Sequence, residues 1–164
     1  MTQNTPSAST ILTSPVHFLA FGFGSGLSPI APGTVGTIVA VLLYLLSQSL
    51  DLLSYSLLTA GICITGVWLC GKSSELLGVH DHGGIVWDEF AGFFITMAGV
   101  SFSWTNLFIG FISFRVFDIL KPWPVSLADK KLHGGFGVML DDVIAALFSA
   151  GVIYIISLIL KVAS

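Results

Sequence analysis

Long uncharged runs alternate with polar stretches along most of the chain. Residues 34–50 and 52–71 carry no charged side chain, and Asp51 alone separates them. Each run is close to the roughly 20 apolar residues that a helix needs to cross a bilayer. We therefore expect two membrane-spanning helices joined by a tight turn, with both open ends on one side of the membrane.

A third uncharged run, residues 90–114, is interrupted by a segment at 101–106 that is typical of a turn. A straight helix over this run would hold Asp88 and Arg115 roughly 40 Å apart, on opposite faces of the membrane. A turn near 101–106 would instead bring both charged ends to one side. We therefore favour a re-entrant or hairpin segment over a single span.

The two ends of the chain complete the predicted architecture. Residues 143–160 form a last apolar run, and Asp141 or Asp142 is placed to cap its helix. Residues 1–15 are polar and uncharged, and we interpret them as a mobile tail before one membrane-embedded domain, 16–164. The elements together predict an all-α class, an integral membrane helical bundle with one polar face.

A segment rich in Gly and Pro, residues 22–37, precedes the first long run, and Thr34 could cap the following helix. A loop that leads into a helix offers free backbone N–H groups and the positive end of a helix dipole to an anion. The pattern lacks the residues of a P-loop and of the dinucleotide fingerprint. A re-entrant or packing loop explains the segment equally well.

The composition agrees with a membrane protein. Hydrophobic residues make up 54% and charged residues 9% of the chain, whereas a soluble domain has about 25% charged residues. The net charge of −3 and the absence of a basic stripe argue against nucleic-acid binding. Most basic residues lie in the polar stretches, and the positive-inside rule then places the polar face in the cytoplasm. These residues are Lys72, Arg115, Lys121, Lys130 and Lys131.

Five acidic residues lie at or near the ends of apolar runs, on the same predicted face. They are Asp88, Glu89, Asp118, Asp141 and Asp142. A plain position at the membrane surface is the simpler alternative, because it avoids the roughly 2.5–3.5 kcal/mol that an acid costs at mid-bilayer. Five acids with basic neighbours favour a joint site, and oxygen ligands suit a hard cation, Mg²⁺ above all. Zinc needs a tighter ligand set than His80 and His82 supply.

The second polar stretch adds candidates for phosphate chemistry. Arg115 and Asp118 share a helix face, so a guanidinium could hold a phosphate oxygen beside a metal-binding carboxylate. Lys121 follows one turn later, where Pro122 ends the helix. His133 could act as a general acid or base, or could be a surface or packing histidine. The chain lacks the motifs of serine and cysteine nucleophiles, which favours metal-assisted phosphoryl transfer.

Four segments, in order along the chain, closely resemble the bacterial phosphatidylglycerophosphatase A family. They are residues 22–34, 79–90, 114–124 and 133–142. The resemblance implies a helical, multi-pass enzyme of the bacterial inner membrane, whose active face the positive-inside rule places in the cytoplasm. It also implies that the enzyme removes the terminal phosphate of phosphatidylglycerophosphate and requires Mg²⁺.

We place roles on the motif residues as hypotheses. The five acids would hold one or two Mg²⁺, and Asp88, Asp118 and Asp141 would be catalytic, with water or an aspartate as nucleophile. Phosphate oxygens would be bound by a second set, Arg115, Lys121, Ser28, Gly33 and Thr34. His133 would protonate the leaving alkoxide. A small cation transporter or channel is the alternative function, although it should carry charge inside its spans. No feature predicts the oligomeric state.

Overall fold

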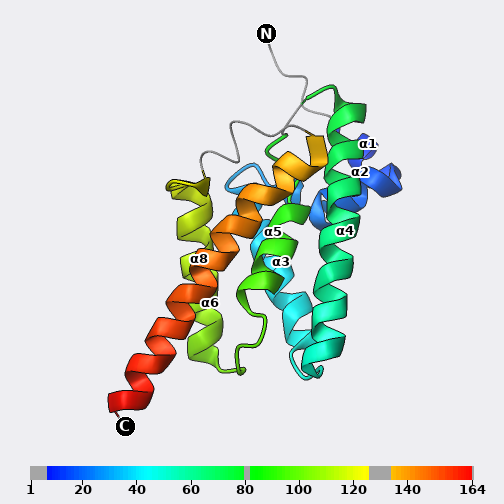
Figure 1. The fold of residues 1–164 in the computed structure, drawn as a ribbon. Helices are drawn as coiled ribbons and strands as arrows, with labels where there is room; N and C mark the ends of the chain where they lie inside the picture. Colours follow the sequence, from blue (N-terminus) through cyan, green and yellow to red (C-terminus); the bar gives the residue numbers. More distant parts are fainter. Residues whose placement is uncertain (1–6, 80–81, 126–133, 164) are drawn as a thin grey trace.

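The structure is a computed structural model that describes residues 7–79, 82–125 and 134–163 (Figure 1). These residues form helices joined by short loops, with no strand among them, so the all-α class is confirmed. Five longer helices build the bundle. They are α3 (Pro32–Ser47), α4 (Leu52–Leu77), α5 (Trp87–Thr96), α6 (Trp104–Leu120) and α8 (Gly134–Ala163).

Two helices in the described part of the chain are long and apolar enough to cross a bilayer. They are α4, over Leu52–Leu77, and α8, over Gly134–Ile159, each with 26 residues. A helix of this length extends about 39 Å, which exceeds the roughly 30 Å of a hydrocarbon core. The outer faces of the bundle carry many exposed apolar side chains, among them Leu46 and Ile64. Such a surface suits lipid, and the predicted membrane helical bundle is confirmed.

Helix α5 forms the centre of the bundle. Figure 1 shows it between α3, α4 and α8, and all three contact it. Its aromatic side chains Phe90, Phe93 and Phe94 are buried. With 10 residues, α5 extends only about 15 Å, which is half a bilayer.

The chain then turns back through residues 97–103 into α6. Ser103 caps α6 by accepting a hydrogen bond from the Asn106 backbone N–H at 3.0 Å. Residues 90–114 therefore form a hairpin, as the interrupted apolar run predicted. The consequence is that Asp88, before the turn, and Arg115, after it, lie at the same end of the bundle.

The tight turn between the first two long helices is also confirmed. Asp51 separates α3 from α4 and accepts hydrogen bonds from the backbone N–H groups of Leu53 and Ser54 at 3.0 and 3.2 Å. This carboxylate caps α4, because it pairs with N–H groups that have no partner inside the helix. The turn lies at the end of the bundle opposite the polar stretches (Figure 1).

Three local expectations are wrong. Helix α3 begins at Pro32 with Ala31 as its cap, so Thr34 lies inside the first turn. Helix α8 already runs from Gly134, so neither Asp141 nor Asp142 caps it, and both lie about two turns inside. Residues 8–13, assigned to a mobile tail, form helix α1 (Ala8–Thr13), because Ile11 is fully buried against the bundle.

The rest of the N-terminal segment packs over the polar end. Helix α2 (Pro15–Ala20) is followed by the short 3₁₀ segment η1 (Gly22–Leu27). His17 in α2 is buried, and its Nδ1 lies 2.9 Å from Ser73 Oγ in α4. The carbonyl oxygen of Ala20 accepts a hydrogen bond from the N–H of Val86, immediately before α5, at 2.9 Å. These contacts attach the N-terminal segment to the helices that carry the acidic residues.

Candidate active site

Three helices bring charged side chains to one end of the bundle. The first turn of α5 carries Asp88 and Glu89, and the last turns of α6 carry Arg115 and Asp118. Helix α8 adds Asp141 and Asp142 from its interior. The hairpin between α5 and α6 is what returns the second polar stretch to the first, so the predicted joint site depends on that turn.

The five acids form two groups that share one member. In each group, one ligand oxygen per residue lies within 4.8 Å of those of the others. The first group is Asp88, Glu89 and Asp142, and the second is Asp118, Asp141 and Asp142. Glu89, Asp141 and Asp142 are buried, while Asp88 and Asp118 are half-buried. Asp142 therefore stands between the two groups.

Arg115 lies beside the acids and contacts three side chains with one nitrogen. Its Nη1 is 2.6 Å from Asp118 Oδ2, 3.5 Å from Glu89 Oε1 and 3.4 Å from Thr37 Oγ1. Its Nε is buried and has no hydrogen-bond partner within the described residues. The guanidinium is thus held in place through Nη1, while Nε is a buried donor without a partner among the described residues.

Lys121 reaches the second group of acids. Its Nζ lies 2.6 Å from Asp141 Oδ2. Helix α6 ends at Leu120, and Lys121 takes a left-handed backbone conformation with φ of 41°. Pro122 follows and disfavours a helical conformation in the residue before it, so the predicted end of the helix is confirmed. This turn directs the lysine across to α8.

The acidic groups have features that a cation would satisfy. Glu89 Oε2 and Asp142 Oδ2 are buried, and neither has a hydrogen-bond partner in the part of the chain that the structure describes. A buried carboxylate without a counter-charge is costly, and among the described residues the ion pairs of the five carboxyl groups involve two basic side chains, Arg115 and Lys121. The ligand atoms of the two described groups are carboxylate oxygens, which fits a hard divalent cation. Both groups could therefore hold a metal ion.

The Gly-rich loop supplies a close approach at Gly33. A Cβ atom on this residue would overlap Glu89 Oε1 and lie 3.0 Å from Arg115 Nη2. Only glycine lets the start of α3 pass this close to the charged groups. One turn later, Thr37 donates to the Gly33 carbonyl oxygen at 2.8 Å and accepts from Arg115. Thr37 was not predicted from the sequence as a site residue, although its four-residue spacing from Gly33 places both on one helix face.

The other predicted residues either have no hydrogen bond to the acids among the described residues or lie outside the described chain. Thr34 is half-buried in the first turn of α3. Ser28 donates to the Ile30 carbonyl oxygen at 2.8 Å and lines a neighbouring pocket of about 500 Å³ with Pro32 and His82. His133 lies outside the described residues.

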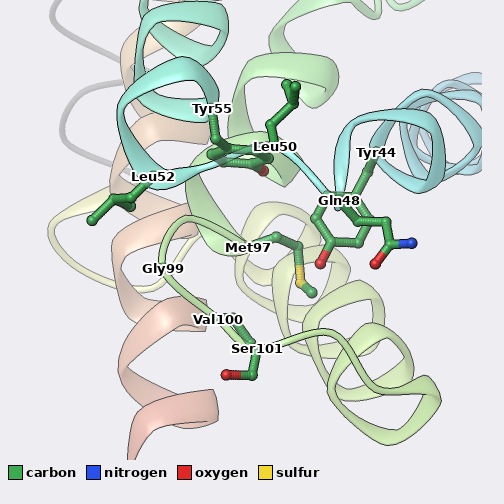
Figure 2. Close-up of a pocket in the computed structure, with 9 residues that line it drawn as sticks. All are labelled: Tyr44, Gln48, Leu50, Leu52, Tyr55, Met97, Gly99, Val100 and Ser101. Atoms are coloured by element: carbon green, nitrogen blue, oxygen red, sulfur yellow. The ribbon is translucent and has the colours of Figure 1, made fainter.

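A smaller cavity of about 180 Å³ lies at the opposite end of the bundle. Figure 2 shows Tyr44 and Tyr55 beside Met97, where the turn after α3 meets the loop after α5. No acidic or basic side chain is among its described lining residues. The Tyr55 hydroxyl donates to the Phe94 carbonyl oxygen at 2.8 Å, which holds the end of α5. Charge chemistry in the described structure is thus concentrated at the other end.

The fold and the site define a class, an integral membrane helical protein with a buried carboxylate centre suited to a metal ion and an anion. The profile of the family Phosphatidylglycerophosphatase A matches residues 18–157. The chain belongs to this family, as its four motifs predicted, and is a phosphatase, a phosphoric monoester hydrolase.

Curated relatives agree with this membership. A Phosphatidylglycerophosphatase A of Escherichia coli is 49% identical over 147 residues, which cover 88% of this chain and 85% of the relative. One of Haemophilus influenzae is 46% identical over 158 residues, covering 95% and 97%. A protein of Bacteroides thetaiotaomicron named Putative phosphatidylinositol-3-phosphatase is 35% identical over 136 residues, covering 78% and 84%. No solved structure matches the chain at a significant level.

Proposed function

We propose that this chain hydrolyses phosphatidylglycerophosphate to phosphatidylglycerol and phosphate, with Mg²⁺, at the cytoplasmic face of the bacterial inner membrane. The observation that carries the proposal is the meeting of five carboxyl groups with Arg115 at one end of a membrane bundle. The names of two close relatives give the substrate. A cation channel would not need a phosphate-binding guanidinium beside its acids.

The two acidic groups would hold the metal. Asp88 and Glu89 would bind on one side and Asp118 and Asp141 on the other, with Asp142 common to both, so the arrangement suits two ions. Bound Mg²⁺ would supply charge neutralisation for the phosphate and lower the pKa of a bound water. The unpaired oxygens of Glu89 and Asp142 support this assignment, because they point to a missing positive partner.

The basic residues would bind and orient the phosphate. Arg115 would donate to a phosphate oxygen through Nε while Asp118 holds Nη1, which fixes the direction of the guanidinium. Lys121 would stabilise charge near the second acidic group, where it already pairs with Asp141. A positioned donor of this kind supplies a large share of catalysis when negative charge increases in the transition state.

Proton transfer and nucleophilic attack would involve one acid from each of the two groups. Asp88 is half-buried and lies in the first turn of α5. It would take a proton from the attacking water. Alternatively, it would attack phosphorus itself as the bond to the glycerol oxygen breaks, and water would then hydrolyse the aspartyl-phosphate to release phosphate. Asp141 would be the second candidate for these roles. His133 would donate a proton to the leaving glycerol oxygen, and Ser28 and Thr34 would assist phosphate binding from the Gly-rich loop.

A phosphate-release assay in detergent tests the function. The purified chain should release phosphate from phosphatidylglycerophosphate, lose the activity in EDTA and regain it with added Mg²⁺. Phosphatidic acid and phosphatidylinositol 3-phosphate serve as competing substrates, the latter because of the third relative. Cation flux through reconstituted vesicles without phosphate release would favour a channel instead.

Asp88→Asn tests the acidic centre directly. The variant should abolish Mg²⁺-dependent phosphate release and still insert in the membrane, because half-buried Asp88 lies at the polar end of the bundle. Asp51→Asn changes an acid at the opposite end, where Asn can still cap α4. This matched control should keep its activity. Full activity in Asp88→Asn would remove Asp88 from the proposed centre.

A further inference from the structure

An apolar groove lies between α3 and α6 on the outside of the bundle. It has a volume of about 400 Å³ and only aliphatic and aromatic lining side chains. Helix α3 contributes two of them and α6 contributes four. They are Ile38, Val41, Trp104, Leu107, Phe108 and Phe111. Ile38, Trp104 and Phe108 are exposed at the outer surface of the bundle, so the groove opens sideways toward the lipid.

The groove begins directly beside the charged site. Arg115 Nη1 lies 3.4 Å from Thr37 Oγ1, which joins the polar start of α3 to the end of α6. Val41 follows Thr37 by four residues, and Phe111 precedes Arg115 by four, so each lies about 6 Å further along its helix on the same face. The two faces therefore change from polar to apolar within one helical turn, in the direction away from the acids.

This change from polar to apolar side chains matches the order of groups in a phosphorylated lipid, from its phosphate to its acyl chains. With the terminal phosphate at Arg115, the headgroup glycerol, the phosphodiester and the acylated glycerol would follow in the direction away from the acids. An acyl chain would then extend along the apolar lining, toward Phe108 and Trp104. Arg115, whose Nη1 lies 3.5 Å from Glu89 Oε1, is one helical turn beyond Phe111. Phe108 and Trp104 lie about 10 and 17 Å from Arg115 along α6, at the end of the groove away from the acids. No other described pocket has lining side chains that are all aliphatic or aromatic.

We propose that the groove between α3 and α6 holds one acyl chain of the lipid substrate while Arg115 holds its phosphate. This inference rests on the proposed function and names how the substrate is presented to that site. Lipid tails are as apolar as the groove, so the groove gains little net hydrophobic energy from a chain. Its effect is orientation, because it fixes the direction from which the phosphate enters the site.

The test compares two substitutions on two ligands. Ile38→Trp places a bulky side chain in the groove, at a position that is 48% exposed. Ile64→Trp makes the same change on α4, at a lipid-facing position that is 73% exposed and outside the groove. The ligands are diacyl phosphatidylglycerophosphate in mixed micelles and its deacylated headgroup, glycerophosphoglycerophosphate, measured as a competitive inhibitor.

Ile38→Trp should lower kcat/KM for the diacyl substrate about tenfold and leave the inhibition constant of the headgroup unchanged. Ile64→Trp should change neither. An equal loss for both ligands in Ile38→Trp would mean that the polar site itself was distorted, and it would overturn the proposal. An equal decrease of kcat/KM for the diacyl substrate in Ile38→Trp and Ile64→Trp would also overturn the proposal.

Photolabelling separates this inference from the proposed function. Phosphatidylglycerophosphate with a photoreactive acyl chain should label residues 104–111 more than α4, whereas photoreactive phosphatidylcholine should label both helices alike. Enrichment on α6 without any phosphate release would keep the groove and reject the hydrolase. Phosphate release with equal labelling of α4 and α6 would reject the groove and keep the hydrolase.

Discussion

Arg115 occupies the position where the acids, the Gly-rich loop and the groove meet. Its Nη1 is shared by Asp118, Glu89 and Thr37, and its side chain is only 12% exposed. A guanidinium can make these contacts and still keep Nε for another acceptor, because its five donors lie in a fixed plane. The ammonium group of a lysine is a single point of charge, so it cannot keep the contacts to Asp118, Glu89 and Thr37 and also donate to a further acceptor at the position of Nε.

Arg115→Lys should therefore lower kcat/KM for phosphatidylglycerophosphate about a hundredfold, the effect of losing one positioned donor. The charge is kept, so metal binding should change little. Lys72→Arg is the matched control, because Lys72 pairs with Glu75 at an exposed position where such pairs contribute little. Steady-state phosphate release measures both variants. An Arg115→Lys enzyme with normal kcat/KM would show that charge alone suffices at this position.

Asp142 is the one acid shared by both groups, so its loss should weaken metal binding at both. We expect Asp142→Asn to lose more bound Mn²⁺, counted by electron paramagnetic resonance, than Asp88→Asn does. The activity of Asp142→Asn should also need a higher Mg²⁺ concentration. Asp88 belongs to one group only, and its variant is therefore the comparison. Equal Mn²⁺ losses in the two variants would contradict a bridging position for Asp142.

At the scale of elements, the turns between helices were predicted correctly where charged residues had to lie outside the membrane. The hairpin over 90–114 followed from placing Asp88 and Arg115 on one side of a membrane, and α5 and α6 have this arrangement. Asp51 predicted the other turn because a single acid between two apolar runs is costly inside the membrane and is therefore expected at its surface. These features depend on the free-energy cost of placing a charged side chain in lipid. That cost is large, and it can be predicted from the local sequence alone.

The start of α8 was mispredicted because its cause is a contact between distant segments. Asp141 and Asp142 look like helix caps in the sequence, yet α8 begins at Gly134 and both acids lie inside it. Their charges are tolerated there because Lys121 and the other acids form a common site. Thr37 was missed for the same reason, since only its contact with Arg115 gives it a role.

The crossing of α4 and α8 depends on Gly135. A Cβ atom there would overlap the Val67 carbonyl oxygen and lie 2.6 Å from the Gly71 backbone N. Small residues at such crossings let two membrane helices approach closely. Gly135→Leu should lower the thermal unfolding midpoint in detergent and reduce activity severalfold, because Asp141 and Asp142 would move with α8. Gly151→Leu on the same helix has open space and should change neither quantity. Similar midpoints for the two variants would contradict a close crossing.

At the scale of the whole molecule, the bundle separates its charges by depth. The acids, Arg115 and Lys121 gather at one end, and the described cavity at the other end has a neutral lining (Figure 2). The family and the phosphatase class, predicted from four motifs, are confirmed. The orientation of the bundle in the membrane stays a prediction, since it depends on the positive-inside rule rather than on any packing contact.

Labelling of single cysteines tests that orientation. Asp51 lies in the turn at the neutral end and Glu75 near the end of α4 at the charged end, and both are exposed. A membrane-impermeant maleimide added to intact bacterial spheroplasts should label Asp51→Cys and should reach Glu75→Cys only after the membrane is opened. The unsubstituted chain controls for Cys63 and Cys70, which lie within α4. The expected pattern follows from the basic residues in the loops at the charged end, which the positive-inside rule places in the cytoplasm. The reverse labelling pattern would place the charged end, and therefore the reaction, at the outer face of the membrane.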